Sequence, residues 1–103
     1  MFTGTLSLDV LLGDVRSLKE KRAVVRPIVA ELRRRFSVAA AEVGDLDLHR
    51  RAQIGVAVVA AEARHCRDVL DNAERHVAGR PEIDLLSARR TLYSSTDDPV
   101  PSP

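Results

Sequence analysis

Residues 2–20 read FTGTLSLDVLLGDVRSLKE, and within this stretch the hydrophobic pattern changes from the period of a strand to that of a helix. Apolar and polar side chains alternate over residues 2–12, as in a strand with one buried face. Ser17, followed three residues later by Glu20, has the form of a capping box, in which each side chain satisfies a free amide at a helix start. The stretch therefore predicts a strand over residues 2–12 and a helix that begins at Leu18.

The predicted first helix extends to Phe36, because its apolar residues fall on one stripe. Pro27 lies in the middle of this helix, where it removes one backbone hydrogen bond and crowds the carbonyl of Ala23. We expect a kink at Pro27. The alternative is two shorter helices, with Pro27 as the first residue of the second. The uninterrupted apolar stripe favours the kink.

A hairpin is expected after the first helix. Residues 37–43 are small and β-branched, too short a run for a helix, and predict the second strand. Residues 44–50 show no hydrophobic periodicity and are expected to form a loop. Residues 52–60 alternate between apolar and polar side chains and predict the third strand.

The last part of the chain predicts one more helix and one more strand. Residues 62–78 place their apolar side chains on one helix face, and Gly79 and Pro81 are positioned to end that helix. Residues 83–93 predict a fourth strand that is polar enough to lie at a sheet edge. Residues 94–103 contain three prolines and few groups to bury, so we expect a disordered tail.

The predicted order is strand, helix, strand, strand, helix, strand. It closes most simply as two right-handed βαβ crossovers on one antiparallel sheet. We therefore expect an α+β fold, a ferredoxin-like βαββαβ sandwich with strand order 4-1-3-2 and both helices on one face. A chain of 103 residues suffices for a single domain, which we assign to residues 1–93.

Composition restricts the function classes. The formal net charge is +1, so there is no global field to draw the protein to nucleic acid, and an anionic partner would need a local patch. Cys66 is the only cysteine, which rules out an intrachain disulfide and a zinc site built on a cysteine pair. Charged residues interrupt the first apolar stretch well short of a membrane span. We expect a soluble cytoplasmic protein that does not contact a membrane.

Three short stretches carry a family resemblance. They are Ser17-Leu18-Lys19-Glu20-Lys21-Arg22, Ala41-Glu42-Val43, and RAQIGVAVV over residues 51–59. With these motifs the chain resembles the YlxP-like family of small bacterial proteins of unknown function. The resemblance covers nearly everything up to about Ser94 and implies a ferredoxin-like sandwich. It also implies a link to translation, because genes of this family often lie beside those for translation initiation and ribosome maturation factors.

Two positions depart from the family pattern. Pro27 stands where relatives usually keep an ordinary helix former, and His49-Arg50 stands where they often show Trp-Gln. The loop before the third strand is therefore expected to differ in packing or in partner contact.

Four cations are expected to form a basic ridge on the first helix. At about 100° per residue they fall on one side of the helix, next to the apolar stripe; they are Lys19, Arg22, Arg26 and Arg33. Such a row can contact phosphates and displace counterions from a nucleic acid backbone. The alternative is a solvated helix face whose long side chains cover apolar edges.

Lys21 differs from these cations because it falls within the apolar stripe and should point towards the sheet. If Val38 and Ala40 face inward on the second strand, Glu42 does too, and the topology brings it near the start of the first helix. We therefore predict a partly buried ion pair between Lys21 and Glu42. We interpret it as structural, because a catalytic lysine would also need a cleft and a depressed pKa.

No set of residues supports catalysis or a metal site. Gly13-Asp14-Val15-Arg16-Ser17 precedes a helix, where amides and Arg16 could hold an anion. A ferredoxin-like sandwich with an Arg in this loop resembles the acylphosphatases. Acylphosphatases also need an Asn on the neighbouring strand, and the only Asn of this chain lies in the predicted second helix. We interpret the histidines as surface residues because their spacing does not suit a shared ion; they are His49, His65 and His76. We expect no enzyme activity, no metal and no cofactor.

The sheet face away from the helices is expected to be open. Sheets that bind RNA by stacking need aromatic side chains on their central strands, and the outward positions here carry none; they are Thr5, Ser7, Asp9, Arg51, Gln53 and Gly55. The same face presents Leu11, Ala57 and Val59, which a second copy of the chain could bury. A homodimer through this face is therefore one expectation.

Two functional hypotheses follow. The first is a non-enzymatic accessory protein of translation or ribosome maturation that contacts the RNA backbone, on ribosomal RNA or a ribosomal subunit, through the basic ridge. The alternative is a homodimeric protein-interaction or regulatory module without nucleic acid binding.

Overall fold

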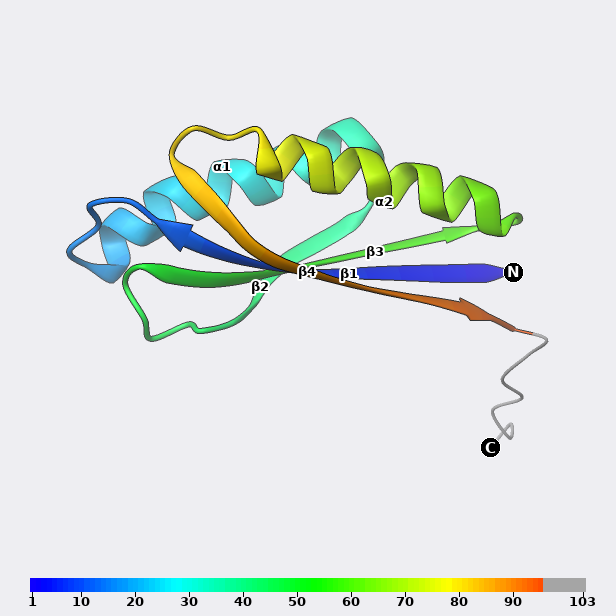
Figure 1. Cartoon of the computed structure of the whole chain (residues 1–103), viewed down its shortest axis with the longest axis horizontal. Coiled ribbons are helices and arrows are strands. Elements are labelled where there is room, and N and C mark those ends of the chain that lie inside the picture. The colour runs from blue at the N-terminus through cyan, green and yellow to red at the C-terminus, as the bar shows by residue number, and fades with distance from the viewer. Residues whose placement is uncertain (96–103) are drawn as a thin grey trace.

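The predicted helices and strands occur in the predicted order in a computed structural model of the protein, which describes residues 1–95 (Figure 1). The elements are β1 (Phe2–Leu12), α1 (Leu18–Phe36), β2 (Ala39–Gly44), β3 (Arg51–Ala60), α2 (Ala63–Ala78) and β4 (Ile83–Ser94). The predicted α+β class is confirmed.

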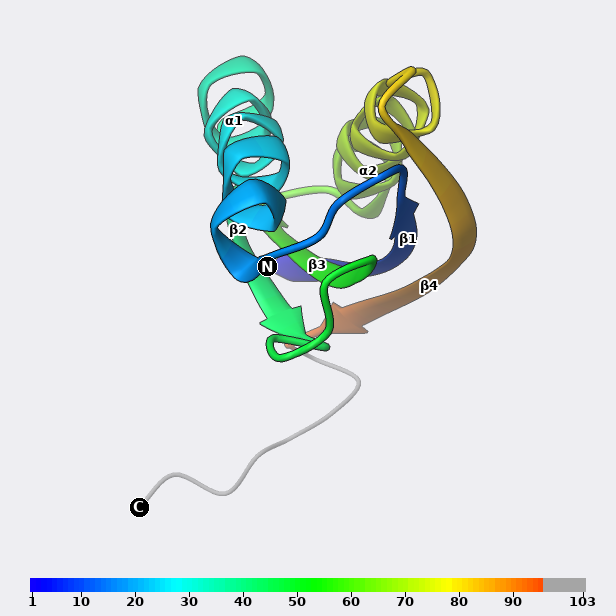
Figure 2. The same ribbon diagram turned by 90° about the vertical axis from the view of Figure 1, so that its left-hand side faces the viewer.

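The four strands form one antiparallel sheet in the order β2-β3-β1-β4, which reads β4-β1-β3-β2 from the other edge. The central strand β1 places Leu6 opposite Val56 of β3 and opposite Arg90 of β4. Both helices lie on one face of the sheet, α1 on the β2 side and α2 on the β1 and β4 side (Figure 2). Within residues 1–95 no helix covers the other face of the sheet, which the sequence predicts to be open.

The core lies between the helices and the sheet. Alternate residues of the two central strands point into it, namely Leu6, Leu8, Val10 and Leu12 of β1 and Ala52, Ile54, Val56 and Val58 of β3. Helix α2 packs closely on β1 at Gly4, where an added Cβ would lie 2.8 Å from Cδ1 of Leu70. The absence of a side chain at Gly4 therefore sets the distance between α2 and the sheet.

Helix α1 begins at Leu18 as predicted, with a variant of the expected cap. Ser17 Oγ accepts from the amide of Glu20 at 3.1 Å. The Glu20 carboxylate accepts from the amide of Arg16 at 2.7 Å, one residue before the Ser17 amide that a capping box would use. The helix then continues through Pro27 as one element, so the two-helix alternative is wrong. Buried Val25 and Ile28 on either side of Pro27 hold the helix to the core, and the kink stays a prediction.

Several predicted boundaries are corrected. Three move by one residue: β2 ends at Gly44, β3 begins at Arg51 and α2 begins at Ala63. The second strand begins at Ala39 rather than at Ser37, because Ser37 adopts a left-handed conformation (φ 52°) that ends α1. The last strand extends to Ser94, and the amide of Ser95 donates to the carbonyl of Met1 at 3.0 Å. The predicted tail therefore does not begin at Ser94, and its residues 96–103 lie outside the described part of the chain.

Candidate nucleic-acid interface

The basic ridge lies on the exposed face of α1. Its four members, Lys19, Arg22, Arg26 and Arg33, are all exposed to solvent. At 100° and 1.5 Å per residue they fall within an arc of about 60° and span about 21 Å of helix. The net charge of the whole chain is only +1, so the residues outside the ridge carry a net charge of −3. The ridge therefore concentrates positive charge on one face of α1.

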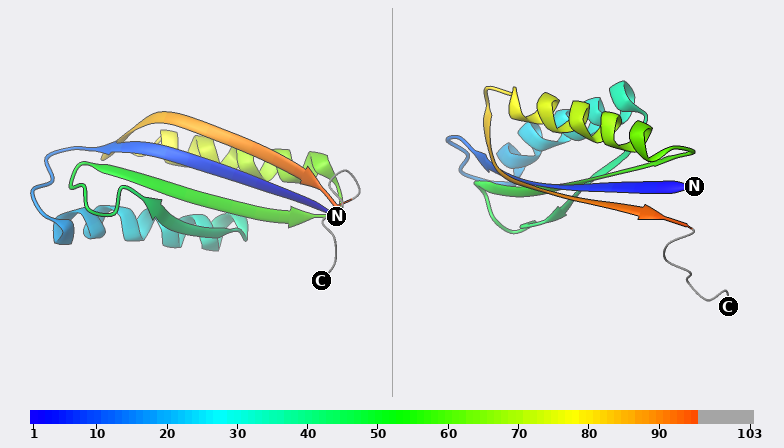
Figure 3. Two further views of the ribbon diagram at one scale, coloured as in Figure 1. Left: turned by 90° about the horizontal axis from the view of Figure 1, so that it is seen from below. Right: turned by 45° about the vertical axis from the view of Figure 1, so that its right-hand side comes forward.

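The ridge borders two hollows. The smaller, of about 370 Å³, lies over Lys19, Arg22 and Arg26 on the helix itself. The larger, of about 570 Å³, lies between α1 and the sheet edge, and we call it the α1–β2 groove. Its lining residues are Arg22, Val25, Arg26, Val29, Ala30, Arg33, Ala41, Glu42 and Leu46. Figure 3 shows α1 running beside the β2 edge of the sheet. The residues that line the groove belong to α1, β2 and the loop after β2.

Arg33 connects the ridge to the sheet. Its Nε donates to the carbonyl of Ala40 at 2.8 Å, and Ala40 lies on the edge strand β2. An edge strand leaves backbone groups on one side without a neighbouring strand, so this bond satisfies one of those groups. It also fixes the position of Arg33 in the lining of the α1–β2 groove, while the side chain stays exposed.

Lys21 and Glu42 are brought together beneath this groove. Lys21 is 1% exposed, and its Nζ lies 2.8 Å from Oε2 of Glu42, whose side chain is 20% exposed. The same Nζ donates to the carbonyl of Asp45 at 2.6 Å and to that of Leu48 at 2.7 Å. An ammonium group has three N–H donors, and three oxygens surround it here. Burial of this charge is therefore compensated by one carboxylate and two carbonyls.

The two carbonyl partners of Lys21 belong to the β2–β3 loop, and sequence reasoning did not find them. Asp45 takes a left-handed conformation (φ 58°), and its carbonyl also accepts from the amide of Leu48 at 3.0 Å. The two acceptors are backbone carbonyls, so the side chains of the loop do not indicate that they bind Lys21. Lys21 consequently fixes the loop to α1 and positions Leu46 against the groove.

The anion-loop candidate Arg16 has local partners. Its Nε lies 3.6 Å from Oδ1 of Asp14, with both side chains more than 80% exposed. Its amide already donates to the Glu20 carboxylate. The start of α1 thus carries its own anionic group, and Arg16 lines neither of the two hollows beside the ridge.

A charged cluster joins the two helices and was not predicted. Glu31 Oε2 accepts from Nη1 of Arg80 at 2.8 Å, and Oε1 lies 3.4 Å from Nε2 of His76. Partial desolvation raises the pKa of Glu31, but the charges of His76, Arg80, Arg35 and Arg34 outweigh it and hold the pKa below its usual value. Arg34 and Arg35 lie within one turn of Glu31 on α1, but His76 and Arg80 come from a distant part of the chain, so no local pattern marks those two partners.

His76 also corrects the interpretation of the histidines as surface residues. Its side chain is 14% exposed, and its ring meets that of Phe36 edge-on with centroids 5.6 Å apart. The end of α1 covers it, which the helix pattern alone did not indicate. Among residues 1–95 no three His, Cys, Asp or Glu side chains are grouped to hold a metal ion.

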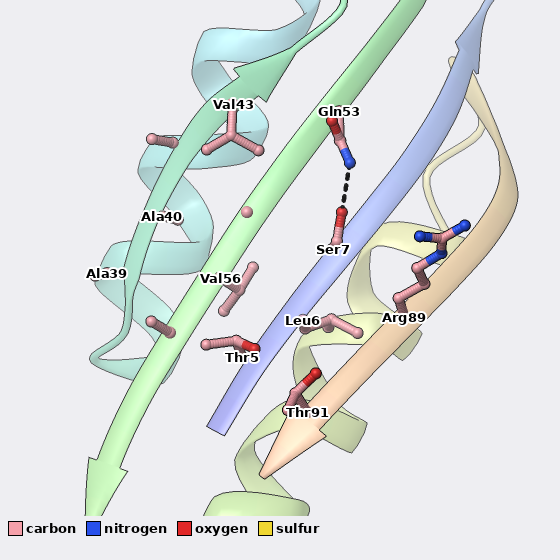
Figure 4. A pocket seen from close by; sticks show the side chains of 13 residues that line it. Thr5, Leu6, Ser7, Ala39, Ala40, Val43, Gln53, Val56, Arg89 and Thr91 are labelled. Atoms are coloured by element: carbon pink, nitrogen blue, oxygen red, sulfur yellow. Dashed lines mark hydrogen bonds between the residues drawn. The ribbon is translucent and has the colours of Figure 1, made fainter. Parts of the chain in front are cut away.

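The uncovered sheet face is concave rather than flat. A hollow of about 580 Å³ crosses all four strands, and several of its lining residues are small, including Ala41, Gly55 and Ala57. Figure 4 shows Ser7 and Gln53 directed towards each other across β1 and β3, with Nε2 of Gln53 donating to Oγ of Ser7 at 2.8 Å. Arg89 and Thr91 of β4 form the opposite side of the hollow from Val43.

No helix in the described part of the chain has the length and apolar character that crossing a membrane requires. Fold and surface together define a small α+β protein with one open sheet face and a cationic groove at the edge of the sheet. A family model described as "Protein of unknown function (DUF503)" matches residues 3–90, and the chain belongs to this family.

A relative of this chain is the "Uncharacterized protein YlxP" of Bacillus subtilis (strain 168). The two are 30% identical over 90 residues, which cover 87% of this chain and 98% of that protein. The resemblance found in the sequence motifs is confirmed.

Proposed function

We propose that this protein is a non-enzymatic accessory protein that contacts the RNA backbone through the basic ridge of α1. The observation that carries the proposal is the grouping of Lys19, Arg22, Arg26 and Arg33 on one exposed helix face, bordering two hollows. Backbone phosphates are the partners that such a row of cations suits, because each contact releases condensed counterions. Arg33 is already oriented by its bond to Ala40, so less side-chain freedom is lost on binding.

The process that this contact would serve is translation or ribosome maturation in the cytoplasm, with ribosomal RNA or a ribosomal subunit as partner. The support is the gene neighbourhood that the family resemblance implies, which is an association and not a physical argument. We also propose the ferredoxin-like class for the fold, because the βαββαβ order, the antiparallel sheet and the single helical layer all fit it.

Binding of the purified protein to ribosomal subunits and to structured RNA tests the proposal. The test variant carries Arg22→Ala, Arg26→Ala and Arg33→Ala. A matched control removes three exposed arginines of α2, namely Arg64, Arg67 and Arg75, and so changes the net charge equally. The proposal predicts that only the ridge variant loses affinity. Absence of binding by the folded wild type at low salt would remove the proposal.

A second candidate function rests on the open sheet face. Small residues line its hollow, and Val59, further along β3 and outside the hollow, is 64% exposed. A second copy of the chain could bury this face, which would make the protein a homodimeric interaction or regulatory module. The candidate predicts that the mass measured by sedimentation equilibrium rises with protein concentration. The variant Ala57→Arg should stay monomeric, and the wild type should have no affinity for RNA.

A further inference from the structure

We infer that the α1–β2 groove holds an unpaired base of single-stranded RNA, with Glu42 accepting a hydrogen bond from an N–H group of that base. The inference rests on the proposed RNA binding and specifies the form of RNA that the ridge takes. It depends on three features of the groove: the apolar side chains that line it, the carboxylate among its arginines, and an exposed leucine in its lining.

The shape and lining of the groove favour a base over a phosphate. The hollow of about 570 Å³ has Val25, Val29 and Ala30 on its helical side. A phosphate gains nothing from these apolar side chains, and the carboxylate of Glu42, which lines the same groove, repels it. An unpaired base has apolar faces and a polar edge, and proteins commonly hold such bases against apolar side chains or guanidinium planes. Arg22 and Arg26 line the same groove and can provide those planes.

A duplex would not use this groove. Its bases are stacked inside the helix, and its phosphates would rest on the outer rim formed by the ridge. Single-stranded RNA can place phosphates on the ridge and turn one base inward. The combination of a cationic rim and an apolar interior therefore points to single strands.

Glu42 is the polar group inside the groove. Its Oε2 is buried against Nζ of Lys21, and Glu42 is among the lining residues with 20% of its side chain exposed. A carboxylate repels phosphate and accepts from N–H donors. Cytosine, adenine and guanine each carry an exocyclic amine that such an acceptor reads. Uracil has no amine, and its single imino N–H lies between two carbonyls, so the groove should discriminate against uracil.

Leu46 lines the groove and is 58% exposed. The contact of Lys21 with the carbonyls of Asp45 and Leu48 holds the loop that carries it. Leu48 lies on the same loop and is 50% exposed but does not line the groove. These two leucines therefore form a matched pair for a test that leaves the ion pair intact.

The experiment measures fluorescence anisotropy of labelled RNA with the full chain. The probes are an eight-nucleotide cytidine strand, an eight-nucleotide uridine strand and a short RNA hairpin with a fully paired stem. We expect the cytidine strand to bind about tenfold more tightly than the uridine strand, the scale of one discriminating base contact. Leu46→Ser should weaken cytidine binding about fivefold, the low end for loss of one base contact, and Leu48→Ser should leave it unchanged.

Glu42→Gln should abolish the preference for cytidine over uridine, and circular dichroism establishes whether this variant is folded. If the hairpin binds as tightly as the cytidine strand, or if Leu46→Ser behaves like Leu48→Ser, the inference is wrong. Hairpin binding that still depends on Arg22, Arg26 and Arg33 would then leave the proposed function standing. If no RNA binds at low salt, both fail.

Discussion

Replacing Lys21 tests how the buried ion pair holds the molecule together. Lys21→Met removes the charge and keeps most of the aliphatic stem that lies in the core. It leaves the buried Oε2 of Glu42 without its cation and the carbonyls of Asp45 and Leu48 without their donor. Breaking a buried pair from one side costs about 3 to 5 kcal/mol. Glu42 is 20% exposed and the carbonyls belong to a surface loop, where water can replace part of the loss. We therefore expect Lys21→Met to lower the free energy of unfolding by about 3 kcal/mol, the low end of that range.

Urea unfolding monitored by circular dichroism measures this loss as a lower midpoint at unchanged slope. Lys19→Met is the matched control, because Lys19 is an exposed lysine on the same turn of α1, and it should change stability by less than about 0.5 kcal/mol. The double variant Lys21→Met with Glu42→Leu should cost less than Lys21→Met alone, since no unpaired charge remains. If the stability loss of the double variant equals the sum of the losses of Lys21→Met and Glu42→Leu, the two residues are not coupled and the reasoning is refuted.

Two further predictions concern packing and pH. Gly4→Val should lower stability by about 1 to 3 kcal/mol in urea unfolding, because a Cβ there meets the fully buried Leu70 at 2.8 Å; an unchanged midpoint would show that Leu70 moves aside freely. The folded pKa of Glu31 lies below its unfolded value of about 4.5, so Glu31 stabilises the fold above that pH, and the contribution is lost as the pH falls through the lowered pKa. Melting temperatures between pH 7 and pH 2 should therefore fall less steeply for Glu31→Gln than for the wild type below about pH 4.5, and parallel curves would contradict this.

The elements of the fold could be predicted because each carries a local signal. Strand β1 shows alternation over its whole length, and Ser17 with Glu20 marks the start of α1. The boundary at Ser37 was missed because a left-handed residue at a helix end is usually a glycine or asparagine, and Ser gives no such signal.

At the candidate site, the orientation of a side chain could be predicted only where the residue lies in a periodic hydrophobic pattern. The inward direction of Lys21 followed from its place on the apolar stripe of α1, and that of Glu42 from its alternation with Ala40. The carbonyls that complete the lysine's surroundings depend on a left-handed Asp45, which sequence does not reveal. The partners of Glu31 on α2 and beyond it depend on how the two helices meet, and helix pairing is a tertiary property.

The salt dependence of RNA binding tests the central claim most directly. If the four cations of the ridge contact four phosphates, the logarithm of the binding constant should fall with the logarithm of salt concentration with a slope of about −3. Removing Arg22, Arg26 and Arg33 should bring the slope close to −1, while the α2 control keeps the wild-type value. Equal slopes for the ridge variant and the wild type, or no binding by the folded wild type at low salt, would contradict the account.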